Sequence, residues 1–174
     1  MATMILLPDS SSSVSLDWIS IGESSPEGAL DDDNGGTSFV KCNDDGEIMI
    51  IGFANPSVAE VDIASIDSVR FLSSGKAVHR TDPSLVDIAF EAPTSGFSES
   101  CSYDAHRTNY ETINGTARTT HDSTHSWTYA NLEALELKCT KDGTVEVYLS
   151  YLVLEVTYTE AVTADNATFF GANF

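Results

Sequence analysis

Alternation of apolar and polar residues with a period of two dominates the chain. Successive side chains of a strand point to opposite faces, so this alternation predicts β-strands. The expected strands are 14–21, 37–41, 47–53, 68–73, 85–92, 97–103, 135–139 and 144–158. Turn-forming runs such as Asp44-Asp45-Gly46 and Thr94-Ser95-Gly96 separate them. Only residues 129–135 are expected to form a helical turn, capped by Thr128 or Asn131.

The clearest expected element is the last hairpin, where Asp142-Gly143 joins two alternating runs. Asp-Gly favours such a turn because glycine accepts the positive φ that it requires. The odd-numbered residues of 145–153 are apolar, but from Leu152 to Tyr158 the even-numbered ones are apolar too. We therefore expect a central strand that is covered on both faces or carries a bulge, and that packs against a second sheet or a partner chain.

Short strands at this spacing predict an all-β protein with an antiparallel β-sandwich, either jelly-roll or concanavalin-like, and one short helical turn. The 174 residues suit one domain. We expect a flexible N-terminal segment at 1–13, the sandwich at 14–160, and a C-terminal tail at 161–174. The apolar side chains Phe169, Phe170 and Phe174 of this tail are interface candidates, which fold back on the core or dock on a neighbouring chain.

The charge is the strongest anomaly of the composition. Eight Lys and Arg residues oppose 27 Asp and Glu residues, for a formal net charge of −19. Such a surface repels phosphate backbones and anionic membranes, so neither nucleic acid nor a membrane is an expected partner. The protein should fold best where salt or divalent cations screen its self-repulsion.

The cysteines indicate a reducing compartment. Cys42, Cys101 and Cys139 are odd in number and form no Cys-x-x-Cys pair. They are expected to be small core residues or free thiols of a protein made in the cytoplasm. The apolar run at 1–7 has no Lys or Arg before it, so we do not expect a secretion signal.

Two segments hold potential metal ligands. Asp31 and Asp33 offer clustered oxygen atoms, as calcium requires, and Asp45 would add another if the two loops meet. An acidic surface turn is the favoured interpretation of these residues. Calcium is therefore a possible ligand, but no cofactor is predicted. His121 and His125 would share a face of a helix, but their segment is rich in loop formers and predicts solvated histidines.

No catalytic motif is visible. The chain has no Gly-x-Ser-x-Gly elbow and no phosphate-binding loop, so an enzyme is not expected and no catalytic residue is assigned. The aromatic residues Tyr103, Tyr110, Trp127 and Tyr129 could stack on sugars or anchor an interface. The favoured interpretation of Trp127 is a side chain at the rim of the core.

Part of the sequence resembles a known class of proteins. Trp127-Thr128 is followed by a Leu-x-x-Leu segment and by a closing strand that ends in Leu154-Glu155-Val156-Thr157-Tyr158, and the run 31–40 adds to the pattern. This combination resembles structural proteins of tailed bacterial viruses, over about residues 18–158. The usual Gly after Leu-x-x-Leu and the usual Pro before Trp127 are absent. The resemblance implies a sandwich in which Trp127, Leu132, Leu135, Val156 and Tyr158 have structural roles.

These observations lead to two hypotheses. The first is a virion structural protein, such as a capsid decoration, fibre or tail adaptor, which is located in the virion, binds other virion proteins and forms a homo-oligomer. The alternative is a carbohydrate-binding module, calcium-dependent or not, for which Trp127→Ala should abolish glycan binding.

Overall fold

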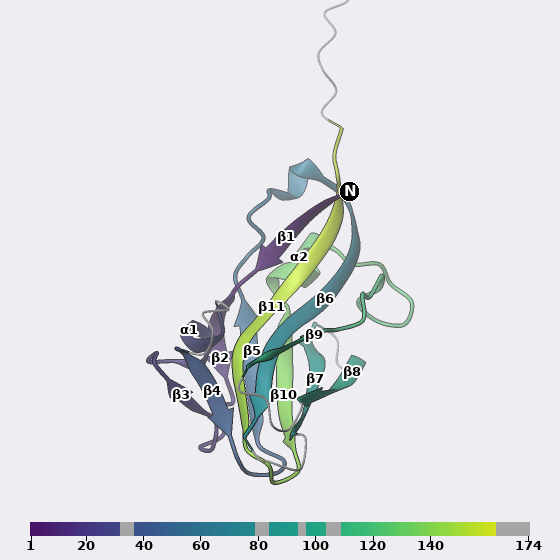
Figure 1. The fold of residues 1–174 in the computed structure, drawn as a ribbon. Helices are drawn as coiled ribbons and strands as arrows, with labels where there is room; N and C mark the ends of the chain where they lie inside the picture. The colour runs from purple at the N-terminus through teal and green to yellow at the C-terminus, as the bar shows by residue number, and fades with distance from the viewer. Residues whose placement is uncertain (32–36, 79–83, 94–96, 104–108, 163–174) are drawn as a thin grey trace, which may run out of the picture.

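Two antiparallel sheets packed face to face make up the protein. The computed structural model describes residues 1–31, 37–78, 84–93, 97–103 and 109–162 (Figure 1). The first sheet has the order β3 (Ile19–Ile21), β4 (Phe39–Cys42), β11 (Val147–Glu160), β6 (Ile63–Ala77), β9 (Glu111–Asn114), and β1 (Ala2–Leu6) also pairs with β11. The second sheet has the order β2 (Pro8–Ser12), β5 (Ile48–Phe53), β10 (Glu136–Asp142), β7 (Ser84–Ala92), β8 (Phe97–Tyr103).

The strand order identifies a jelly roll. From β4 to β11 the chain places β4, β6, β9 and β11 in the first sheet and β5, β7, β8 and β10 in the second. The resulting neighbours, β4-β11-β6-β9 and β5-β10-β7-β8, are those of an eight-stranded jelly roll. The predicted all-β antiparallel sandwich is therefore confirmed, and the order selects the jelly roll of the two expected architectures.

The long strand β11 carries a bulge. The sequence predicted either such a bulge or a strand covered on both faces. Leu149 pairs with Gly75 and Tyr151 with Ser74, so Ser150 is the extra residue. The bulge moves the buried face from odd-numbered to even-numbered residues. The buried side chains on the inner face are accordingly Val147 and Leu149 before it, and Leu152, Leu154, Val156 and Tyr158 after it.

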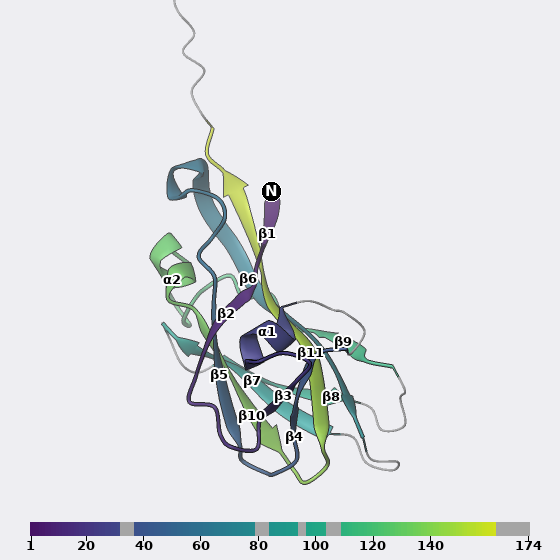
Figure 2. The ribbon, with the colours of Figure 1, turned by 90° about the vertical axis from the view of Figure 1, so that its left-hand side faces the viewer.

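The helical segments are short. The predicted turn is α2 (Tyr129–Glu133), whose N-cap Thr128 accepts a hydrogen bond from the Asn131 backbone N–H. A second helix, α1 (Pro26–Leu30), was missed, because the run Pro26-Glu27-Gly28 predicts only a turn. It lies beside β2, β4 and β11 and buries Ala29 and Leu30, so it covers one side of the sandwich (Figure 2). A 3₁₀ turn, η1 (Glu60–Asp62), precedes β6.

The N-terminal prediction was wrong. Residues 1–13 were expected to be flexible, but β1 pairs with β11 and β2 pairs with β5, one in each sheet. The expected strand 14–21 is reduced to β3, and before it the Ser15 backbone N–H donates to the Ile48 carbonyl oxygen at 2.9 Å. Of the predicted tail, the structure describes only residues 161 and 162; Phe169, Phe170 and Phe174 lie outside the described residues.

The interior between the sheets is apolar. Its buried residues include the three cysteines, all free. Burial raises the pKa of Cys42 to about 11 and that of Cys101 to about 12, and it also raises the pKa of Cys139. These thiols stay protonated at neutral pH and fill space in the core, as the sequence predicted. Within the described residues, no helix is both long and apolar enough to cross a bilayer.

Candidate functional site

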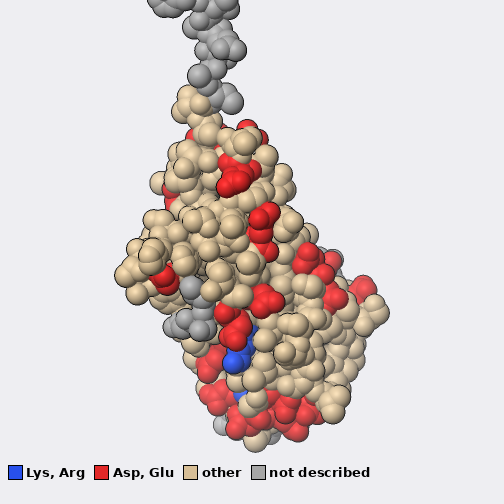
Figure 3. Space-filling view, turned by 180° about the vertical axis from the view of Figure 1, so that it is seen from behind, with Lys and Arg blue, Asp and Glu red and all other residues tan. Residues whose placement is uncertain are grey.

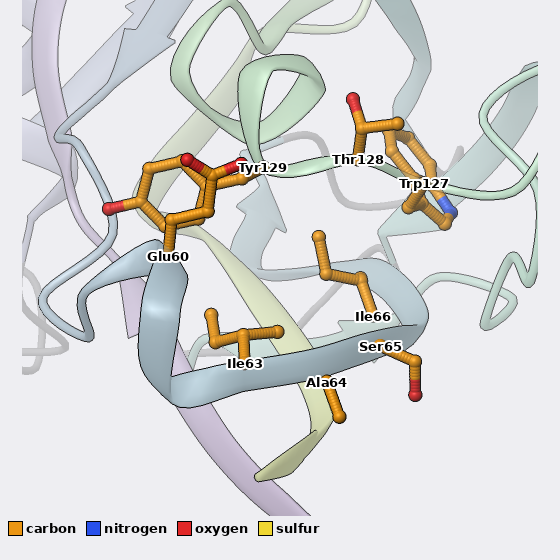
Figure 4. A pocket seen from close by; sticks show the side chains of 8 residues that line it. All are labelled: Glu60, Ile63, Ala64, Ser65, Ile66, Trp127, Thr128 and Tyr129. Carbon is orange, nitrogen blue, oxygen red and sulfur yellow. The ribbon is translucent and has the colours of Figure 1, made fainter. Parts of the chain in front are cut away.

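An open pocket lies where the start of β6 faces the loop that leads into α2 (Figure 4). Its volume is about 220 Å³. Ile63 and Ile66 project from β6 into it, while Trp127 and Thr128 come from the opposite loop. Glu60 and Tyr129 lie at its other end. The pocket therefore combines an apolar floor with two aromatic rings and a carboxylate.

Local contacts fix the two aromatic rings. Trp127 is 5% exposed, and its indole N–H donates to the Arg118 carbonyl oxygen at 2.8 Å. The Tyr129 hydroxyl donates to the Val58 carbonyl oxygen at 3.1 Å, which holds its ring against the segment before η1. Because Trp127 is buried, little of its ring is open to the pocket, as expected of a side chain at the rim of the core. Tyr129 is the half-exposed ring of the pair.

The sequence did not point to three residues of the pocket, Glu60, Ile63 and Ile66. Glu60 lies in η1, and the two isoleucines open β6, which was expected to begin only at residue 68. Pairing with β11 extends β6 upstream through two irregularities, opposite Thr157–Tyr158 and opposite Thr159–Glu160. These bulges break the period-two alternation, so no local signal marks the start of the strand.

A second group of aromatic side chains lies on the outer face of the first sheet. The Phe39 and Tyr148 rings stack with centroids 4.6 Å apart. The Lys76 ammonium lies 4.5 Å from the Tyr110 ring centroid and 5.4 Å from that of Tyr148. Partners within the protein thus occupy faces of all three rings. This cluster supports the sheet and is a poorer platform for a ligand than the pocket.

The weak calcium candidates, for which an acidic surface turn was the favoured interpretation, do not form a cluster in the described part of the chain. Asp31 is the C-cap of α1, and Asp33 lies outside the described residues. Asp45 accepts a hydrogen bond from the Gly143 backbone N–H at 2.7 Å, so it fixes the neighbouring β10–β11 turn. Asp45 lies in the loop between β4 and β5. Carboxylates gather at the lower end of the molecule in the view from behind (Figure 3).

His121 and His125 are brought together with Asp122. The two rings stack with centroids 5.8 Å apart, and the His125 Nδ1 lies 2.7 Å from Asp122 Oδ2. The His125 side chain is 74% exposed, as expected for a solvated loop histidine, but that of His121 is only 16% exposed. The prediction of two solvated histidines is therefore correct for His125 only.

The other residues singled out by the sequence are structural. Tyr103 is fully buried between the sheets, and its hydroxyl lies 2.8 Å from Ser73 Oγ. The five residues to which the resemblance assigned structural roles all lie in the core: Trp127, Leu132, Leu135, Val156 and Tyr158.

Comparison with known proteins finds solved structures that are similar over most of the chain but share little sequence identity with it. No protein-family model matches the sequence, and neither does any curated protein. The C-terminal CBM6 of LamC, a marine laminarinase from Zobellia galactanivorans, has 9% identity and a TM-score of 0.46, with 90% of this chain and 100% of that chain covered. A family 29 carbohydrate-binding module from Piromyces equi has 10% identity and a TM-score of 0.39, with coverages of 89% and 91%.

A third similar structure is the N-terminal cellulose-binding domain of β-1,4-glucanase C from Cellulomonas fimi. It has 13% identity and a TM-score of 0.37, with 90% of this chain and 98% of that chain covered. At these identities and TM-scores, the likeness identifies neither a family nor a ligand for this chain. None of these three structures is a virion protein.

Proposed function

We propose that the chain is a non-catalytic glycan-binding module and that its site is the pocket beside Tyr129. The observation that carries this proposal is the meeting of Tyr129, Trp127 and the Glu60 carboxylate around one open pocket. Sugars present apolar C–H faces, which pack on aromatic rings, and hydroxyl groups, which donate to a carboxylate. The volume of about 220 Å³ lies below the range typical of drug-sized ligands, so it suits one sugar unit of a chain lying across the surface.

The charge of the protein narrows the class of glycan. A net charge of −19 repels sulfated and uronic acid polymers, and Glu60 adds a negative charge at the site itself. A neutral glycan meets no such repulsion. It can donate hydroxyl hydrogens to Glu60 while its apolar face packs on Tyr129 or on the Ile63 and Ile66 floor.

A polysaccharide array that holds neutral and anionic members tests the proposal. We expect binding to neutral members only, at an affinity that Glu60→Gln weakens, because the amide is a poorer acceptor than the carboxylate. Glu133→Gln, an exposed residue of α2 outside the pocket lining, is the matched control and should bind like the wild type. An array without hits would contradict the proposal, and so would equal binding by both variants.

A second candidate function, assembly with other chains, rests on exposed apolar side chains at the η1 end of the molecule. Val61 is 81% exposed and Val162 is 94% exposed. A hydrogen bond of 2.8 Å from the Ala161 N–H to the Asp62 carbonyl oxygen holds the two segments together. Such side chains are candidates for burial in a homo-oligomer or against virion proteins. A location in the virion stays a prediction.

Light scattering after size exclusion tests assembly. If the η1 end forms the contact, the wild type elutes as an oligomer and Val61→Asp dissociates it, since a charge would be buried in the interface. Leu16→Asp is the control. Leu16 is 96% exposed, but it lies far from η1: its neighbour Ser15 is hydrogen-bonded to Ile48 at the start of β5, at the opposite end of the molecule. A monomeric wild type would rule this candidate out.

A further inference from the structure

The tip of the hairpin between residues 120 and 126 is a compact turn built around one carboxylate. Thr120 and Ser126 form an antiparallel bridge, and the His121 N–H donates to the His125 carbonyl oxygen at 2.9 Å. Inside this turn, Asp122 Oδ1 accepts hydrogen bonds from the backbone N–H groups of Thr124 at 2.7 Å and His125 at 2.6 Å. Oδ1 therefore fixes the conformation of the turn.

The other carboxylate oxygen of Asp122 faces the two imidazoles. Oδ2 lies 2.7 Å from His125 Nδ1 and 4.0 Å from His121 Nε2. One potential ligand atom from each of the three residues lies within 4.8 Å of the others.

This donor set suits a particular class of cation. Two imidazole nitrogens and one carboxylate oxygen are ligands of Zn²⁺ and its neighbours in the first transition row, whereas calcium takes oxygen ligands only. Zn²⁺ binds such ligands at about 2.0–2.2 Å, so ligand atoms of one ion lie roughly 3–4 Å apart. The His125 side chain is 74% exposed and can turn away from its 2.7 Å contact to reach that spacing.

We infer that the side chains of His121, Asp122 and His125 form a binding site for one divalent transition-metal ion of the Zn²⁺ type. The ion would take the place of the direct contact between His125 Nδ1 and Asp122 Oδ2 and would leave at least one coordination position to water. It would also fasten the hairpin 120–126 beside Trp127, whose ring centroid lies 6.0 Å from that of His121. This inference is independent of the proposed glycan function.

Titration of the full chain with Zn²⁺ against a chromophoric chelator tests the site, with excess Ca²⁺ present to occupy non-specific carboxylates. We expect one equivalent to bind. Asp122→Asn is the sharpest variant, because the amide oxygen can still accept the backbone hydrogen bonds while the amide nitrogen cannot bind the ion. The Kd should rise at least about 10- to 100-fold in Asp122→Asn and in His125→Ala. Asp87→Asn, on β7, is the control and should not change it.

Imidazole NMR spectra locate the ion. On addition of Zn²⁺ we expect shifts of the His121 and His125 resonances, because these rings become ligands. Shifts confined to His79 and His106 would overturn the inference. Equal Zn²⁺ affinity of the wild type and of Asp122→Asn, with the fold intact by circular dichroism, would overturn it too.

Discussion

Tyr103 links the two sheets through a buried contact that depends on a glycine. Its hydroxyl lies 2.8 Å from Ser73 Oγ on β6, and its ring lies next to Gly75. A Cβ at Gly75 would stand 2.7 Å from a Tyr103 ring carbon and 2.8 Å from a Leu149 methyl carbon. Real Cβ atoms do not approach so closely, so an alanine here would force the Tyr103 ring and the Leu149 side chain to move.

We expect Gly75→Ala to lower the free energy of unfolding by about 1–3 kcal/mol, the usual cost of overpacking a core. Urea denaturation measures this change. Gly28→Ala is the matched control, because an added Cβ in α1 meets its nearest neighbour at an ordinary 3.5 Å and alanine favours a helix. It should leave stability unchanged or raise it. A Gly75→Ala variant as stable as the wild type would refute the close approach.

At the scale of elements, the strands that were predicted well are those with one buried face. The predicted boundaries 97–103 coincide with β8, and 85–92 differs from β7 by one residue. The last hairpin was predicted correctly because its apolar positions alternate and its turn contains Asp142-Gly143. The bulge at Ser150 was foreseen as one of two options, since the apolar face changes parity there.

The elements that were missed give no such signal. The β2 strand Pro8–Ser12 is held by its backbone pairing with β5, and all of its side chains except Pro8 are at least partly exposed. Such an edge strand looks like a polar loop in the sequence. The pocket was missed for another reason: Glu60 in η1 and Tyr129 in α2 come together only through the tertiary fold, in which the Tyr129 hydroxyl donates to the Val58 carbonyl oxygen. No local pattern can predict a contact between segments so far apart.

At the scale of the molecule, the charge is unevenly distributed. Exposed carboxylates gather at the end formed by the β4–β5 and β10–β11 loops, among them Asp44, Asp45 and Asp142 (Figure 3). Partial desolvation and then the neighbours Asp44 and Glu47 raise the pKa of Asp17. A carboxyl group whose pKa is raised by folding binds its proton more tightly in the folded state. The folded state therefore gains stability as the pH falls through the raised pKa, and ionised Asp17 destabilises it at neutral pH.

We expect the melting temperature to rise with NaCl, because salt screens this repulsion. Asp17→Asn should raise the melting temperature at pH 7 in low salt, and the gain should shrink as NaCl is added. Asp9→Asn, an exposed residue of β2, serves as the control. A melting temperature that does not depend on NaCl in either protein would show that the acidic end costs no stability.

The proposed glycan function depends on the pocket beside Tyr129 being the binding site, and calorimetry of two variants tests this most directly. Wild type, Tyr129→Ala and Tyr148→Ala are each titrated with the neutral oligosaccharide that the array selects. Loss of a stacking ring should weaken binding by about 0.5–1.5 kcal/mol, or roughly 2- to 12-fold in Kd, for Tyr129→Ala. Tyr148→Ala, which removes a ring from the outer face of the first sheet, should bind like the wild type. The reverse order of affinities, or no change in either variant, would contradict the assignment of the site.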